Sequence, residues 1–265
     1  MNRLTKKFND LRRAHKKAFI AFITAGYPSV SFTEQLIHEF DAIGVDVLEL
    51  GVPFTDPMAD GPVIQQASFE ALKRGINLDT IFAFVKRSRR TVSMPICLMT
   101  YYNPVFCYGV ARFVKNAVAA GVDGVLIPDL PPEEAKELIA HARQAGLATI
   151  FFVAPTTSEK RIRSIVGSST GFIYYVSLTG VTGARRSLPS DMVGHIRRIK
   201  KVTRLPVCVG FGVSTNQQVR LVERIADGVI VGSAIVSAIK ESCGKPNAVK
   251  KIGAFVAHLT RSTRV

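Results

Sequence analysis

Residues 48–62 read LELGVPFTDPMADGP, an apolar strand that runs into a loop of proline, glycine and aspartate. A strand buried on both faces of a sheet should be an unbroken run of valine, isoleucine and leucine, and Glu49 interrupts this one. A carboxyl group in such a place either costs several kcal/mol or has its pKa raised. Proteins tolerate that mainly where the group performs chemistry, so the segment predicts a buried strand that carries a catalytic acid.

Apolar strands alternate with helical patterns on both sides of this segment. Eight such units predict a (β/α)₈ barrel, an α/β TIM-barrel fold whose parallel sheet closes on itself. The alternative is an open doubly wound sheet, but residues 25–28, AGYP, lack the glycine pattern expected after its first strand. The predicted strands are residues 18–24, 47–52, 95–101, 122–128, 148–154, 171–177, 206–210 and 227–231, and the predicted helices are 32–43, 78–87, 110–120, 132–145, 158–166, 190–202, 215–224 and 248–259.

The units also resemble one another where a helix ends and a strand begins. The junctions read IGVD at 43–46, AGVD at 120–123 and IADG at 225–228. No linker or change of composition divides the chain, which predicts one barrel domain over residues 1–265. Residues 1–15 form an amphipathic pattern through Leu4, Phe8 and Leu11, so we expect an N-terminal helix that caps this domain.

Composition excludes several classes of protein. The 265 residues are 47% hydrophobic and contain no apolar run long enough to span a bilayer, so we expect a cytoplasmic protein without a membrane partner. The five histidines are dispersed and the four cysteines form no Cys-x-x-Cys pair, which predicts no metal site and four reduced thiols. The net charge of +15 comes from scattered lysines and arginines. This distribution favours a solvated basic surface that attracts anionic substrates over a nucleic-acid site.

The catalytic rim of a TIM barrel lies at the carboxyl ends of its strands. Alternation along the strand puts Leu48 and Leu50 against the helices and Glu49 in the barrel mouth, where it suits general acid–base catalysis. A structural Glu braced by internal hydrogen bonds is the alternative. In the loop that follows, spacing alone does not separate Asp56 from Asp60, because either could be a turn residue.

Glycines near the ends of the last two strands predict a phosphate site. Residues 210–212 read GFG and residues 232–233 read GS, and each precedes a helical segment whose backbone N–H groups can hold an anion. Residues 180–189 are long for a strand-to-helix loop, and we expect them to form a lid over the mouth. Together these features predict an enzyme that acts on a phosphorylated small molecule.

Nearly the whole chain resembles the tryptophan synthase alpha chain family. The resemblance lies in residues 48–62, 98–104 (LMTYYNP), 180–183 (GVTG), 210–212 and 232–234 (GSA), and the first segment is the most specific. It implies retro-aldol cleavage of indole-3-glycerol phosphate to indole and glyceraldehyde 3-phosphate, without a cofactor. It also implies that Glu49 is the general acid–base, that Asp60 stabilises the positive charge on the ring nitrogen, and that Asp56 faces a partner chain.

The resemblance further implies a substrate site and a partner. The partner is a beta chain that carries pyridoxal phosphate, receives the indole and completes an alpha2-beta2 heterotetramer. A phosphosugar isomerase, a regulatory chain without turnover and a nucleic-acid-binding protein are the competing hypotheses, and an intact Glu49 and Asp60 argue against the first two. The implied substrate-binding residues are Phe22, Met99, Tyr101, Tyr174, Thr182, Gly183, Phe211, Gly212, Gly232 and Ser233.

Overall fold

The computed structural model describes residues 2–176, 190–210 and 212–260, and in this part of the chain the strands form one parallel sheet. The sheet order is β5-β4-β3-β2-β1-β9-β8-β7-β6. The end strands β5 and β6 are separated only by Phe151 and form one barrel strand, so the predicted eight-stranded barrel is confirmed. The strands are β1 (Ala18–Thr24), β2 (Val47–Gly51), β3 (Ile96–Met99), β4 (Gly124–Leu126), β5 (Ala148–Ile150), β6 (Phe152–Val153), β7 (Ile173–Val176), β8 (Val207–Gly210) and β9 (Gly228–Val231).

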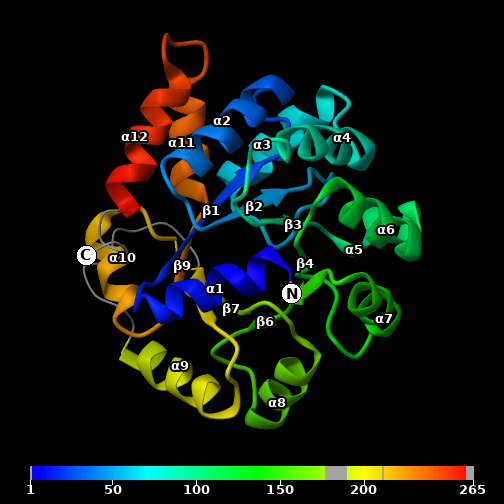
Figure 1. Ribbon diagram of the computed structural model, residues 1–265, viewed down its shortest axis with the longest axis vertical. Coiled ribbons are helices and arrows are strands. Elements are labelled where there is room, and N and C mark those ends of the chain that lie inside the picture. The colour runs from blue at the N-terminus through cyan, green and yellow to red at the C-terminus, as the bar shows by residue number, and fades with distance from the viewer. Residues whose placement is uncertain (1, 177–189, 211, 261–265) are drawn as a thin grey trace.

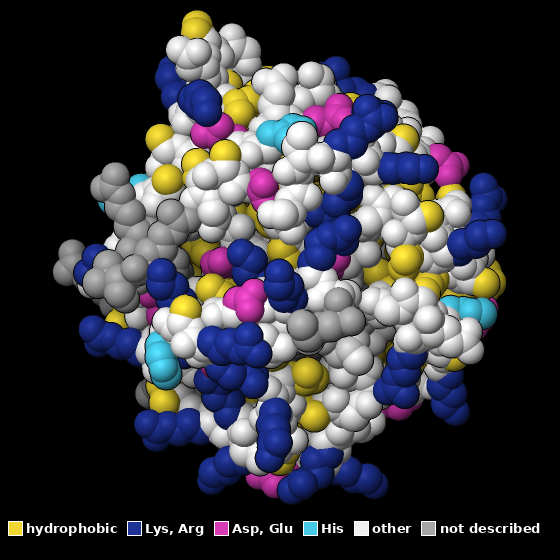
Figure 2. All heavy atoms as spheres, in the orientation of Figure 1, with side chains coloured by type: hydrophobic (Ala, Val, Ile, Leu, Met, Phe, Trp, Pro, Cys, Tyr) yellow, Lys and Arg dark blue, Asp and Glu magenta, His cyan; other side chains and the backbone are white. Residues whose placement is uncertain are grey.

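Helices surround this sheet, as Figure 1 shows. Among the described residues none of them is long and apolar enough to cross a membrane. Lysine and arginine side chains are spread over the face drawn in Figure 2, with acidic side chains among them. The helices that match predicted ones are α1 (Arg3–Arg13), α2 (Val30–Ala42), α4 (Leu78–Ser88), α6 (Val110–Ala120), α7 (Lys136–Ala145), α8 (Glu159–Ser168), α9 (Ser190–Val202), α10 (Asn216–Glu223) and α12 (Ala248–Thr260).

Three further helices were not predicted, namely α3 (Pro62–Lys73), α5 (Tyr102–Tyr108) and α11 (Ser233–Ser242). Proline at the start of α3 suits the first turn of a helix, although we took it as part of the loop. Several strands are also shorter than predicted. The prediction for residues 95–101 is wrong at its end, because β3 stops at Met99 and Tyr101 is the N-cap of α5. Helices α5 and α11 begin within three residues of the strand before them, whereas α3 follows β2 after the loop of residues 52–61.

Helix α1 closes the end of the barrel where the strands begin, and Figure 1 shows it lying across that end. Leu4 and Phe8 are buried and pack with residues that fill the barrel interior, including Val47 and Phe172. The rings of Phe8 and Phe172 lie 5.6 Å apart. The predicted capping helix is therefore confirmed, and the other end of the barrel is left for a site.

The repeated junctions in the sequence have a common structural role at this closed end. An aspartate just before one strand accepts a hydrogen bond from a backbone N–H in the first two residues of the neighbouring strand. That N–H would otherwise lack a partner in the sheet. The pairs are Asp46 with Phe19 at 2.9 Å, Asp123 with Ile96 at 2.9 Å, and Asp227 with Val207 at 3.0 Å.

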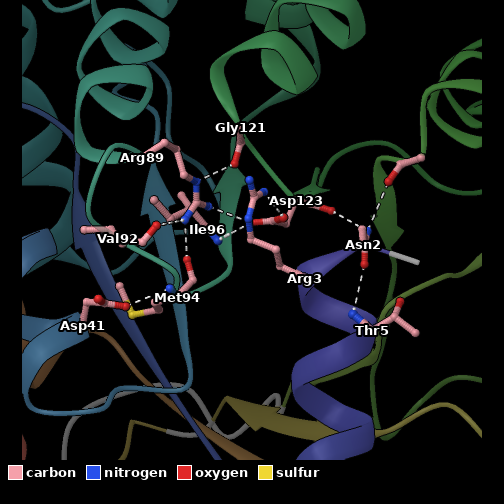
Figure 3. Close-up of polar contacts among 11 residues, drawn as sticks. Asn2, Arg3, Thr5, Asp41, Arg89, Val92, Met94, Ile96, Gly121 and Asp123 are labelled. Atoms are coloured by element: carbon pink, nitrogen blue, oxygen red, sulfur yellow. Dashed lines mark hydrogen bonds and ion pairs between the residues drawn. The ribbon is translucent and has the colours of Figure 1, made fainter.

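Basic residues on and beside α1 bind the same aspartates. Arg3 lies 2.9 Å from Asp123, Lys7 lies 3.5 Å from Asp46 and Lys17 lies 3.7 Å from Asp227. Asp123 also holds the buried Arg89, whose guanidinium donates to it at 2.7 Å and to the carbonyls of Gly121 and Met94 (Figure 3). This network joins α1, α4 and two strands at the end of the barrel that faces away from the catalytic rim.

Candidate active site

Strand β2 places Glu49 inside the barrel, as the alternation predicted. Leu48 and Leu50 belong to the layer between sheet and helices, whereas Glu49 is in register with Phe22 of β1 and Cys97 of β3. Cys97 is part of the cluster that fills the barrel. Glu49 is fully buried, so its side chain is surrounded by protein at the level of the inward-facing Phe22.

The carboxyl group of Glu49 is not braced by hydrogen bonds. Neither of its oxygens has a partner among residues 2–176, 190–210 and 212–260, which argues against the structural alternative. Burial raises the pKa of Glu49 to about 8, because the apolar interior disfavours the charged form. Glu49 is therefore a neutral acid at pH 7 that can donate a proton.

Asp60 lies at the edge of the same barrel mouth and is half-buried. The Tyr101 hydroxyl donates a hydrogen bond to its Oδ2 at 3.1 Å. Burial raises the pKa of Asp60 to about 6 and the hydrogen bond from Tyr101 opposes that rise, so Asp60 is mostly ionised at pH 7. Asp56 is exposed and accepts only a local bond from Thr55 at 2.6 Å. The structure therefore separates two aspartates that spacing could not.

A cavity of about 190 Å³ opens beside Asp60 and is lined by most of the predicted substrate-binding residues. Its floor and walls include aromatic, aliphatic and glycine residues from six different strands or the segments after them. Glu49 does not line it directly, but its register partner Phe22 does. The lining residues are Phe22, Ala59, Asp60, Gly61, Ile64, Met99, Tyr174, Gly210, Gly212, Ile230, Gly232 and Ser233.

A second cavity, of about 410 Å³, shares Ala59, Met99 and Tyr174 with the first. It extends the mouth toward Phe152, whose ring centroid lies 4.8 Å from that of Tyr174. Phe152 was not among the predicted site residues, although its place in the predicted strand 148–154, near the carboxyl end, could have indicated it. Ile64 was not among them either, because the helix that carries Ile64 was not predicted.

The glycines of the mouth make room for the aromatic walls. A Cβ on Gly51 would lie 2.6 Å from the Phe22 ring, and a Cβ on Gly210 would collide with the Tyr174 ring. Contacts this short are not tolerated, so larger residues would displace both rings into the cavity.

Opposite Asp60, the N-terminus of α11 faces the cavity through Gly232 and Ser233. No side chain caps this helix end. Its first N–H groups therefore point toward the cavity with the positive end of the helix dipole, an arrangement that suits an anion such as phosphate. Gly212, the other predicted phosphate residue on the described chain, has φ +51° and lines the same cavity.

Some predicted residues are not brought into either cavity. Thr182, Gly183, Phe211 and the expected lid at residues 180–189 lie outside the described residues. Tyr101 is buried behind Asp60 and is not among the described residues that line the two cavities. The described residues contain no cluster of histidine, cysteine or acidic groups that could hold a metal ion. The four cysteines are free, and Cys97 and Cys208 are buried.

Comparison with known proteins links this geometry to one family. The sequence model for the tryptophan synthase alpha chain matches residues 8–264. The tryptophan synthase alpha chain of Geotalea daltonii is 52% identical over 245 residues, which cover 92% of this chain and 93% of the relative. That of Geotalea uraniireducens is 49% identical over 98% of this chain and 97% of its own.

Solved structures agree with the sequences. Tryptophan synthase subunit alpha from Legionella pneumophila superposes with a TM-score of 0.92 at 37% identity, and the match covers all of both chains. A chain of tryptophan synthase from M. tuberculosis, in an open form with BRD0059 bound, gives a TM-score of 0.90 at 33% identity, again over all of both chains.

Proposed function

The chain belongs to the tryptophan synthase alpha chain family, and from this premise we propose which of its residues carry out the family reaction. That reaction is the cleavage of indole-3-glycerol phosphate to indole and glyceraldehyde 3-phosphate. It needs no cofactor in the alpha chain, since pyridoxal phosphate belongs to the beta chain. The observation that carries the assignment is a neutral, buried Glu49 beside an ionised Asp60 at one barrel mouth.

Glu49 is the general acid–base. Its proton goes to carbon C3 of the indole ring, and the positive charge that results is shared with the ring nitrogen. The bond between C3 and the glycerol chain then breaks as its electron pair returns to the ring. The adjacent hydroxyl loses its proton and becomes the aldehyde, and a proton returned to Glu49 completes the cycle. A protonated carboxyl at pH 7 is what the first step requires, and burial without hydrogen bonds supplies it.

Asp60 is the charge stabiliser. An ionised carboxylate at the cavity edge attracts the ring N–H most strongly when the nitrogen becomes positive, so it favours the protonated intermediate over the bound substrate. Its placement in the lining of the cavity supports this role, whereas the exposed Asp56 lines neither cavity.

The two ends of the cavity suit the two ends of the substrate. Phe22, Met99 and Tyr174 provide apolar and aromatic surface for the indole ring, and we assign Phe211 to the same wall. Gly212, Gly232 and Ser233 bind the phosphate at the N-terminus of α11, together with Thr182 and Gly183. The distance between these ends is spanned by the glycerol chain, which places the scissile bond near the middle of the mouth.

The partner of this family is the beta chain, with which alpha chains form an alpha2-beta2 complex. The tip of the 54–60 loop exposes Asp56 and Met58, the latter 91% exposed. We assign this tip to the contact with the beta chain, and we assign the protein to the cytoplasm, where a biosynthetic enzyme of this kind would meet its substrate.

Indole release from indole-3-glycerol phosphate by the purified chain, with and without a beta chain, tests the proposed function. Glu49→Gln should lower kcat by at least ~10²-fold, because a positioned proton donor usually contributes a rate enhancement of that size. A substrate analogue should still bind. Asp60→Asn should also lower turnover.

A matched control is Glu223→Gln on α10. Glu223 is half-buried and its pKa is raised to about 7, mainly by burial, but it lies near Lys17 at the closed end of the barrel. The Glu223→Gln variant should release indole at the wild-type rate. A folded Glu49→Gln protein with wild-type turnover would overturn the assignment of the acid.

A further inference from the structure

Tyr101 occupies a different place from the other residues predicted to bind substrate. It is buried, and its hydroxyl is fully used by the acid loop, meaning residues 54–60. The hydroxyl accepts a hydrogen bond from the backbone N–H of Ala59 at 2.9 Å and donates one to Asp60 Oδ2 at 3.1 Å. A phenol that accepts one bond and donates its only proton to another has a fixed orientation.

The ring of Tyr101 is held as firmly as its hydroxyl. It stacks on Phe54 at the start of the acid loop, with centroids 5.2 Å apart and planes at 28°. Phe54 is fixed in turn by the buried Ser68 of α3, which accepts from its N–H at 2.8 Å and donates to its carbonyl at 3.2 Å. Tyr101 therefore touches both ends of the acid loop while leaving the tip, with Asp56 and Met58, exposed.

We propose that Tyr101 is a positioning residue for Asp60: its hydroxyl holds the carboxylate at the cavity edge as an oriented, ionised acceptor, and it does not contact the substrate. This inference rests on the proposed role of Asp60. It replaces the expectation that Tyr101 binds the substrate, and it explains how an aspartate on a loop can be oriented as accurately as a residue on a strand.

Among the described groups near Asp60, the Tyr101 hydroxyl is the donor that stabilises its carboxylate. Tyr174 of β7 faces it across the cavity, and the pKa of Tyr174 is raised by burial and by the charges of Glu49 and Asp60. Asp129 acts on Tyr101 from the loop after β4, again with negative charge. The pKa of Asp60 itself is raised by burial and lowered by the hydrogen bond from Tyr101.

Tyr101→Phe tests the inference, because it removes the hydroxyl and keeps the ring on Phe54. The first readout is independent of turnover: a ¹³C NMR titration of the Asp60 carboxyl in the free protein, assigned by its loss in Asp60→Asn. We expect the midpoint to move upward from about 6 by roughly one pH unit, since a hydrogen bond to the charged form is lost.

The second readout is kinetic. The acid limb of the kcat/KM profile should move upward with the NMR midpoint, and kcat/KM at pH 6 should fall by roughly tenfold, as expected when a charge-assisted hydrogen bond is lost. KM for substrate should change less than kcat. In the Asp60→Asn background, Tyr101→Phe should have no further effect, because the hydroxyl acts only through that carboxylate.

Tyr102→Phe is the matched control, since it removes the next hydroxyl along the chain, which makes no hydrogen bond among the described residues; its profile should be unchanged. An unmoved Asp60 midpoint in folded Tyr101→Phe, or a rise in KM with an unmoved acid limb, would overturn the inference and indicate substrate contact instead. Failure of the wild-type chain to release indole would overturn the proposed function, and the NMR titration would still decide whether Tyr101 holds Asp60.

Discussion

Glu49 and Asp60 differ in protonation at neutral pH because their surroundings differ. Glu49 is enclosed by apolar groups and the described residues offer it no hydrogen bond, whereas Asp60 is half-buried and receives the Tyr101 hydroxyl. The pKa values of about 8 and about 6 therefore leave a window in which one group is an acid and the other an anion. Separating two carboxyls by environment is a general way to assign acid and base roles.

This separation predicts a bell-shaped dependence of kcat/KM on pH. Activity should fall below about pH 6 as Asp60 is protonated, and above about pH 8 as Glu49 loses its proton. Steady-state indole release across pH 5 to pH 9 measures both limbs, to about one pH unit. A profile that keeps rising beyond pH 9 would mean that the ionised form of Glu49 is the active one.

Burial of Glu49 also predicts how the free energy of unfolding depends on pH. The folded-state pKa of about 8 lies above the ordinary 4.5, so the contribution of Glu49 to stability is fully present below pH 4.5 and is lost as pH rises toward 8. Glu49→Gln does not titrate. Between pH 5 and pH 8 the free energy of unfolding of Glu49→Gln should therefore rise relative to that of the wild type, by up to a few kcal/mol.

Urea unfolding at four or five pH values measures that difference. The exposed Glu137 provides the control, because Glu137→Gln should show the same pH dependence as the wild type. A constant offset between Glu49→Gln and wild type over this range would contradict a raised pKa for Glu49.

At the scale of elements, the residues that stabilise the fold through ion pairs and the residues proposed for catalysis lie at opposite ends of the barrel. Aspartates just before the strands accept from an N–H near the start of the neighbouring strand and bind basic residues on and beside α1. At the other end, α3 and Tyr101 hold the acid loop through Ser68 and Asp60. The closed end therefore tolerates buried ion pairs that take no part in catalysis.

The closed end supports a prediction that compares the two partners of one network. Asp123→Ala leaves the Arg89 guanidinium buried, with a side chain only 8% exposed and no carboxylate at 2.7 Å, and should cost about 3–5 kcal/mol of stability. Arg3→Ala removes a side chain that is 49% exposed and should cost less than about 1 kcal/mol. Denaturant unfolding measures both, and indole release by the folded fraction should be near wild type. Equal losses would show that Arg89 does not depend on Asp123.

At the scale of the whole molecule, one face of the barrel is closed by α1 and the opposite face presents the acid loop. The net charge of the chain is +15, and lysine and arginine side chains are spread over the face drawn in Figure 2, where α1 closes the barrel. The apolar side chains exposed on the open side, Met58 at 91% and Phe106 at 65%, belong to the acid loop and to α5. The open face therefore carries both the substrate entrance and the surface assigned to the partner.

This arrangement predicts that substitutions of Asp60 and Asp56 impair different activities of the protein. Asp60→Asn should lower indole release with and without the beta chain, because Asp60 lines the cavity. Asp56→Asn should leave the intrinsic rate of the alpha chain unchanged and reduce its stimulation by the beta chain several-fold, since rim charges mainly influence association. Asp10→Asn on α1, at the closed face, should alter neither rate. The reverse pattern for Asp56 and Asp60 would exchange their roles.

The periodicity of the sequence was sufficient to predict the barrel, the capping helix and the inward Glu49. Those features depend on local alternation of apolar and polar residues, which any strand or helix must show to bury one face. The same local logic failed for α3, α5 and α11, because each begins among proline, glycine, serine or asparagine residues that also signal loops.

Other properties were decided only by tertiary structure, because they depend on residues far apart in the chain. Asp56 and Asp60 have the same local signature. They differ because Asp60 is half-buried at the cavity and accepts from Tyr101, 41 residues further along the chain, whereas Asp56 is exposed. The pKa of Glu49 is likewise raised because residues of several other strands bury it, and the sequence of β2 alone does not reveal that burial. Local pattern thus determined which segments form the barrel, whereas burial and hydrogen bonding between distant segments decided which carboxyl is an acid, which is an anion and which is exposed on the surface.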